Sequence, residues 1–228
     1  MISSTGISYL LVSIGLGLFA FRFYQAWQSV KGLLGKLLFY FLVSFCLVTL
    51  CAAIGGLFFT HNQTALFWLF ILSNLFLAVG GGIAGYLICW FEFPQISPWY
   101  GFWGIFALGI LSLISSFVIE VKPFLDVSGA INWDFRFPVN FFQFLLYLFT
   151  FPCLIYIFFR QFCLSKDNDV KAKALGMVSI LFLGFILAYT DLILEPVFQL
   201  TPIVSDFIGA ILGILMIILI VIPILESE

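Results

Sequence analysis

The chain has 228 residues, of which 64% are hydrophobic and only 9% are charged, and its mean hydropathy is +1.22. Soluble domains have about 25% charged residues, so this chain has too few charges to cover the surface of a water-soluble globule. A net charge of −2, with nine cations spread along the whole sequence, argues against nucleic-acid binding. The composition therefore predicts an integral membrane protein with the lipid bilayer as its main surroundings.

Seven stretches are long enough to cross a bilayer, whose hydrocarbon core of about 30 Å requires roughly 20 mostly apolar residues per helix. No stretch alternates polar and apolar residues with a period of two, which argues against a transmembrane barrel of strands. We therefore expect one all-α domain, residues 1–228, folded as a bundle of seven transmembrane helices. The predicted helices cover residues 6–27, 33–59, 65–91, 99–121, 139–163, 170–195 and 203–225.

Two boundaries in this series have a specific chemical basis. The first stretch has no basic region before it and no small-residue cleavage site after it, so we expect a retained helix rather than a signal peptide. The third and fourth stretches are separated by only seven residues, 92–98. Pro94 and Pro98 in this segment predict a true break, because proline ends one helix and is well suited to start the next.

The lysines and arginines predict an orientation, because cytoplasmic loops of membrane proteins carry an excess of these residues. With the N-terminus outside, the inner loops would hold seven of the nine cations and the outer loops only Lys122 and Arg136. We therefore expect a multi-pass protein of the cell membrane, with its N-terminus outside and its C-terminus in the cytoplasm. The seven inner cations are Arg22, Lys31, Lys36, Arg160, Lys166, Lys171 and Lys173.

Glycines spaced one helical turn apart predict close helix packing in two spans. Gly81 and Gly85 form a G-x-x-x-G pattern in the third span, and Gly209 and Gly213 repeat it in the last. Small residues at this spacing let the backbones of lipid-embedded helices approach each other. The deeply placed Asn74 is expected to form hydrogen bonds with neighbouring helices.

The sequence contains no recognisable metal, cofactor or catalytic motif. The five cysteines lie within or at the ends of apolar stretches, and their spacing matches neither a disulfide framework nor a zinc site. The phosphate-binding pattern G-x-x-x-x-G-K-[ST] is absent, and no nucleophile can be paired with a base. We therefore expect no cofactor, no metal and no enzymatic activity.

Ionisable residues at the predicted outer ends of the helices are the main candidates for function. Asp191 and Glu195 are four residues apart and so face the same way on an α-helix, while Asp206 lies about one turn into the last helix. Buried like charges can recruit a cation, and acids within spans are functional candidates. An outward-facing vestibule is expected to bind a ligand or cation through Asp191, Glu195, Asp206, Glu120 and His61. The alternative is that each acid only marks where its helix meets water.

Topology and two sequence segments suggest a family. The segments are 21–27 (FRFYQAW), which leads into the second span, and 171–176 (KAKALG), which opens the sixth. Seven spans with a basic first inner loop resemble the seven-helix membrane region at the N-terminus of many bacterial and archaeal histidine kinases. The resemblance covers nearly the whole chain and implies a sensory role. Those proteins continue into a kinase, whereas this sequence ends at Glu228, so the signal is expected to pass through a protein partner or a homo-oligomer.

Two other functions remain open from the sequence. The same acids could recruit cations at the entrance of a small cation- or proton-linked transporter or channel, or the chain could be a structural subunit of a membrane complex. Transport is disfavoured because no ionisable residue lies near the middle of a predicted span. A retinal pigment is excluded because the last span, 203–225, has no lysine for a Schiff base.

Overall fold

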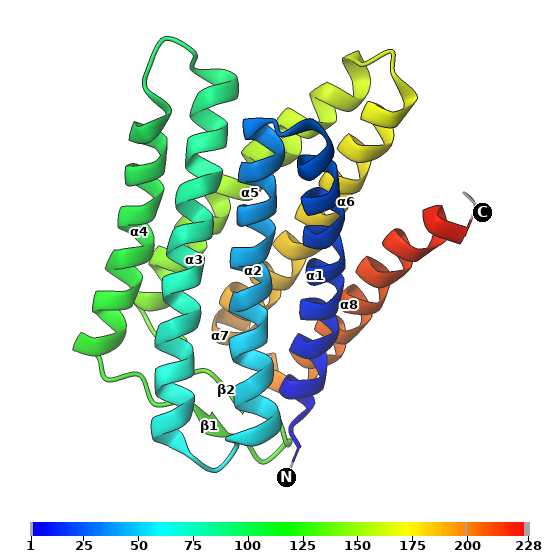
Figure 1. The fold of residues 1–228 in the computed structure, drawn as a ribbon. Coiled ribbons are helices and arrows are strands. Elements are labelled where there is room, and N and C mark those ends of the chain that lie inside the picture. The colour runs from blue at the N-terminus through cyan, green and yellow to red at the C-terminus, as the bar shows by residue number, and fades with distance from the viewer. Residues whose placement is uncertain (1, 199, 226–228) are drawn as a thin grey trace.

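The computed structural model describes residues 2–198 and 200–225, and within them seven long helices run up and down the molecule (Figure 1). All seven are long and apolar enough to cross a membrane, which confirms the predicted all-α class and the seven predicted stretches. The helices are α1 (Ser4–Val30), α2 (Leu33–Phe58), α3 (Gln63–Glu92), α4 (Pro98–Val118), α5 (Val139–Leu164), α6 (Asn168–Tyr189) and α8 (Pro202–Leu225).

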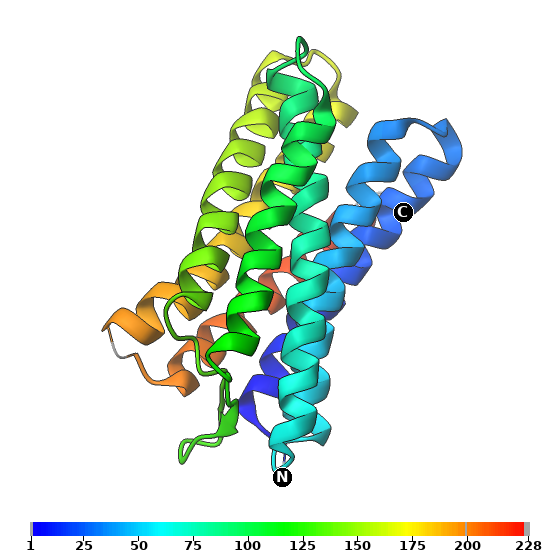
Figure 2. The same ribbon diagram turned by 90° about the vertical axis from the view of Figure 1, so that its left-hand side faces the viewer.

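The two ends of the bundle differ in the segments they carry. The turns α1–α2, α3–α4 and α5–α6 lie at one end, and Lys31, Lys36, Lys166, Lys171 and Lys173 lie in or beside them; we call it the cationic end. The start of α1, the α2–α3 turn and a short hairpin lie at the other, which we call the hairpin end (Figure 2). The cation-rich segments predicted to share one side of a membrane therefore share one end of the bundle.

Glycine contacts bring neighbouring helices close together. A Cβ on Gly85 would lie 2.8 Å from the Gly101 carbonyl carbon of α4, and one on Gly213 would lie 2.8 Å from the Val12 amide nitrogen of α1. The other two glycines of the predicted patterns also face side chains, with Gly81 against Leu146 of α5 and Gly209 against Ser8 of α1. In sequence order the helices pack side by side, and α8 closes on α1.

The segment between α4 and α5 contains a hairpin that was not predicted. Strands β1 (Phe124–Leu125) and β2 (Ile131–Asn132) pair antiparallel. The turn forms because the Asp126 carboxylate accepts hydrogen bonds from the Ser128 amide (3.1 Å) and hydroxyl (2.6 Å), and because Gly129 adopts a φ of +84°. The amide of Ser4 donates to the Gly129 carbonyl (3.2 Å), so the hairpin is attached to the start of α1.

The sixth helix also differs from its predicted form. Regular α-helix ends at Tyr189 and is followed by a π-helical turn, η1 (Thr190–Leu194), and a short helix, α7 (Glu195–Phe198). The amide of Glu195 donates to the Thr190 carbonyl five residues earlier, as in a π-helix. The π-helical turn was not predicted from the sequence, and it interrupts the regular α-helical ladder between Asp191 and Glu195.

Candidate ligand-binding site at the hairpin end

Asp206 joins α8 to α1 through two hydroxyl groups. Its side chain is only 7% exposed, and its Oδ2 accepts hydrogen bonds from Ser4 Oγ (2.5 Å) and Thr5 Oγ1 (2.8 Å). Thr5 Oγ1 in turn accepts a hydrogen bond from the backbone amide of Ile131 in β2 (2.7 Å). The carboxylate of α8, the first turn of α1 and the hairpin therefore form one connected hydrogen-bond chain.

Asp191 joins the π-helical turn to the same two helices. One of its carboxylate oxygens accepts a hydrogen bond from the Tyr9 hydroxyl of α1, and the other from the Ser205 hydroxyl of α8. Each acid thus receives two hydroxyl donors. We call this set the hydroxyl–carboxylate cluster; its members are Ser4, Thr5, Tyr9, Asp191, Ser205 and Asp206.

Hydroxyl groups, rather than cations, satisfy the two acids. Within the described ranges, no lysine, arginine or histidine forms an ion pair with Asp191 or Asp206. A buried carboxylate without an opposite charge is costly unless its oxygens are hydrogen-bonded. Four hydroxyls from two helices meet this requirement, so the position of these acids depends on α1, η1 and α8 staying together.

Glu195 lies just beyond the apolar segment Val170–Leu194, next to the two acids of the cluster. Burial, followed by the nearby charges of Asp191, Asp206 and Asp126, raises the pKa of Glu195 from 4.5 to about 8. Among the described residues, the charges that act on it are all acidic. The raised pKa means that folding favours the protonated form of this carboxyl.

This proton predicts a pH-dependent stability. Between pH 4.5 and about 8 the folded state binds more protons at Glu195 than the unfolded state, so raising the pH through this range should lower the free energy of unfolding. Glu195→Gln should reduce that loss and melt at a higher temperature than wild type at pH 8.5. Thermal unfolding in mild detergent between pH 5 and 8.5 measures the effect. Glu92→Gln, which removes an acid paired with Arg160 at the cationic end, is the control and should leave the slope unchanged.

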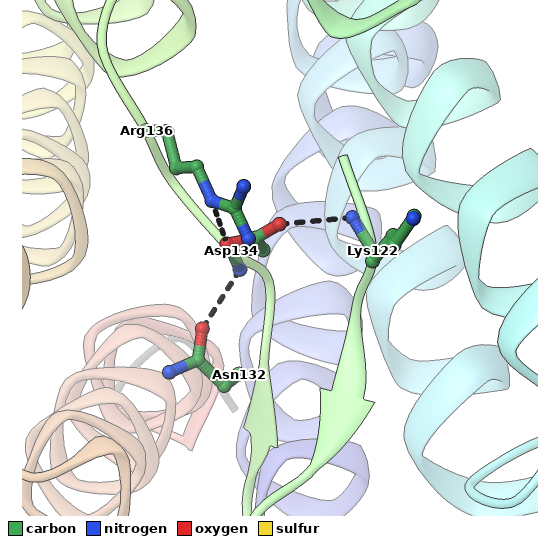
Figure 3. A network of polar contacts seen from close by, with 4 residues as sticks. All are labelled: Lys122, Asn132, Asp134 and Arg136. Atoms are coloured by element: carbon green, nitrogen blue, oxygen red, sulfur yellow. Dashed lines mark hydrogen bonds and ion pairs between the residues drawn. The ribbon is translucent and has the colours of Figure 1, made fainter. Parts of the chain in front are cut away.

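Glu120 and His61 do not join the cluster. Glu120 pairs with Lys122 at 3.8 Å, and the two side chains are 78% and 63% exposed. His61 is exposed in the α2–α3 turn, and in the described part of the chain neither residue bonds to a cluster member. The adjacent loop has its own network, in which Asp134 accepts from Arg136 Nε (2.6 Å) and from the Lys122 amide (2.9 Å) (Figure 3). The structure thus gathers three of the five predicted site residues.

A cavity of about 110 Å³ lies between the helices, and the cluster reaches its wall. Tyr9 and Asp191 line it together with Gln143 and Tyr147 of α5. Most of the remaining wall is aromatic or aliphatic, including Trp133 from the segment after β2. Small-molecule sites commonly combine apolar walls with a few converging polar groups. The candidate site is therefore this cavity with Asp191 in its wall, rather than an open acidic vestibule.

The sequence matches no protein-family model and no curated protein. In the ranges 2–198 and 200–225, no group of three or more histidine, cysteine, aspartate or glutamate side chains could hold a metal ion. The polar and aromatic groups that meet at the candidate site are hydroxyl, carboxylate, amide and aromatic side chains.

Several residues of the site were not among the predicted ones. Ser4, Thr5, Tyr9 and Ser205 are common residue types near helix ends, and their spacing contains no motif. Asn74 was predicted to form hydrogen bonds between helices, and it does: its Oδ1 accepts from Gln143 Nε2 of α5 (2.5 Å) and from Ser112 Oγ of α4 (3.3 Å). The sequence also contained one signal for the π-helical turn. Pro196 lacks the N–H that a regular α-helix would bond to the Leu192 carbonyl, so it disfavours regular helix after Tyr189.

Proposed function

We propose that this protein is a seven-helix membrane sensor that binds a ligand in the cavity whose wall includes Tyr9 and Asp191 of the hydroxyl–carboxylate cluster. The observation that supports it most directly is the placement of Asp191. This residue lines the cavity and at the same time accepts hydrogen bonds from Tyr9 of α1 and Ser205 of α8. A ligand that contacts Asp191 therefore competes with, or strengthens, the contacts that hold two helices together.

The π-helical turn supports such a change in helix contacts. Its backbone hydrogen-bond pattern departs from the regular helical ladder, and π-helical turns occur frequently at functional sites. A ligand shifts a conformational equilibrium only if it binds one arrangement better than the other. Contact with Asp191 supplies that difference, because the same carboxylate takes part in the α1–η1–α8 junction. Helix α1 then extends without interruption to Val30, beside the cationic end.

The distribution of charge supports an orientation for this sensor. Cytoplasmic loops are enriched in lysine and arginine, so we place the cationic end in the cytoplasm and the hairpin end outside, in the cell membrane. The ligand would then come from outside, and the signal would leave through a protein partner or a homo-oligomer at the cationic end. Binding outside and signalling inside is also the sensory role implied by the resemblance to the membrane regions of histidine kinases.

The proposal predicts that a change in the cluster is felt at the cationic end. Spin labels at positions 29 and 166, in a cysteine-free background in nanodiscs, report the separation of the α1–α2 and α5–α6 turns; both sites are exposed. Asp206→Asn removes the charge to which the Ser4 and Thr5 hydroxyls donate and should shift the distance distribution by about 2 Å, the size of helix shifts in known switches. Pulsed electron–electron resonance measures it.

Asp134→Asn is the matched control, because Asp134 lies at the same end but is bonded to Arg136 and Lys122 instead of the cluster. It should leave the distribution unchanged. Equal distributions in the Asp206→Asn variant and the wild type would contradict the sensor. Saturable cation or proton flux in vesicles reconstituted with the wild-type chain would also contradict it and would favour a transporter.

A further inference from the structure

We infer that the cavity binds a small protonated amine that carries an apolar group. This inference rests on the proposed sensor function and adds the chemical class of its ligand. It depends on three properties of the cavity: the polar atoms that remain available there, the aromatic character of its wall, and its size.

The available polar atoms are mainly hydrogen-bond acceptors. Gln143 is only 4% exposed and lines the cavity; its Nε2 donates to Asn74, while its Oε1 has no hydrogen-bond partner in the described part of the chain. The Tyr147 hydroxyl, also in the wall, has no partner in that part either. Each carboxylate oxygen of Asp191 accepts one bond, and a carboxylate has about four acceptor positions in total. A ligand with several N–H donors matches these groups.

The charge and the wall both favour a cation. Asp191 is the only charged residue type among the described residues that line the cavity, so an anionic ligand would find no positively charged partner and would be repelled by Asp191. Aromatic rings attract cations through their faces, and the attraction strengthens where water is excluded. A protonated amine would provide the positive charge that the described part of the cluster lacks. The aromatic residues of the wall, besides the two tyrosines, are Phe41, Phe45, Phe70, Trp133, Phe135 and Phe151.

The volume limits the size of the ligand. The cavity measures about 110 Å³, and an engineered protein cavity of about 150 Å³ accommodates benzene. This cavity is smaller but only partly enclosed, so it takes a molecule of about one ring with a short substituent, such as benzylamine, with part of the molecule extending beyond it. A long polyene or a lipid chain would not fit without a large change in helix packing.

Benzylamine and benzyl alcohol, which have the same shape but differ in charge, test the inference. Titration calorimetry on the full chain in nanodiscs at pH 7 should show saturable binding of benzylamine, about tenfold tighter than that of benzyl alcohol. Asp191→Asn should weaken benzylamine binding by about tenfold. Tyr147→Phe should weaken it by about fivefold and should fold normally, because the hydroxyl that it removes has no partner in the described structure.

Thr49→Val is the matched control. Thr49 also lines the cavity, but its hydroxyl donates to carbonyls of its own helix, Cys46 at 3.0 Å and Phe45 at 3.3 Å. This variant should bind benzylamine within about twofold of wild type. Equal affinity for the alcohol and the amine, or amine binding that neither Asp191→Asn nor Tyr147→Phe changes, would overturn the inference. The spin-label experiment needs no ligand, so it can support the sensor even if benzylamine fails to bind.

Discussion

Gly85→Ala is expected to destabilise the protein by about 3 kcal/mol, near the upper end for inserting a methyl group into a packed interface. The new Cβ would overlap the Gly101 carbonyl of α4, with its carbon only 2.8 Å away. A backbone carbonyl cannot rotate aside as a side chain can, so α3 and α4 must separate. Close contact of this kind is a main source of stability between helices in lipid, where hydrophobic burial contributes little.

Unfolding by sodium dodecyl sulfate from mild detergent micelles, followed by far-ultraviolet circular dichroism, measures the loss. Gly104→Ala is the control in the facing helix α4, where a Cβ would meet nothing within 4 Å. That substitution should be neutral or should stabilise the helix by up to about 1 kcal/mol, the propensity difference between glycine and alanine. If the two variants prove equally stable, the close α3–α4 contact is not a determinant of stability.

Thr5→Val is expected to cost about 3 kcal/mol, although the two side chains have nearly the same shape. Thr5 is 1% exposed, and its hydroxyl both donates to Asp206 and accepts from the Ile131 amide. Valine would therefore leave a buried carboxylate with one donor fewer and a backbone N–H without an acceptor. A buried group left unsatisfied costs about 1–3 kcal/mol, and here two groups are affected.

Thr150→Val provides a matched comparison. Thr150 is fully buried, but its hydroxyl donates only within its own helix, to the Leu146 carbonyl at 2.7 Å and the Tyr147 carbonyl at 3.4 Å. Those carbonyls belong to the helical ladder, so its loss should cost less than about 1 kcal/mol. Thermal unfolding of the two variants measures the difference. A small effect at both positions would mean that the hairpin and α8 are held to α1 by packing rather than by the hydroxyl–carboxylate cluster.

In the double variant Thr5→Val/Asp206→Asn, the two losses should not add. The coupling should amount to about 1–2 kcal/mol, because both substitutions break the same hydrogen bond. Such a coupling would identify the bond itself, rather than a general loosening of α1, as the source of the effect. It would also support the sensor, since this bond holds α8 to α1 within the cluster.

The helices could be predicted from the sequence because each depends on a continuous run of apolar residues. The run in residues 33–59, for example, corresponds to α2 within one residue at its C-terminal end. Prediction was less accurate where a helix end depends on tertiary contacts. The fourth helix ends at Val118 rather than at residue 121, because the chain turns there into the segment that leads to the hairpin.

The low charge content determined the membrane class, and the lengths of the apolar runs determined the number of long helices, because solvation by lipid is a property of composition and length alone. It also drew attention to a few acids, of which Asp191, Glu195 and Asp206 do lie close together. Only the tertiary structure decided what surrounds them. Asp206 bonds to residues 201 and 202 positions away in the chain, and Asp191 to one 182 positions away. No local pattern encodes contacts across such separations, since they arise when α8 closes on α1.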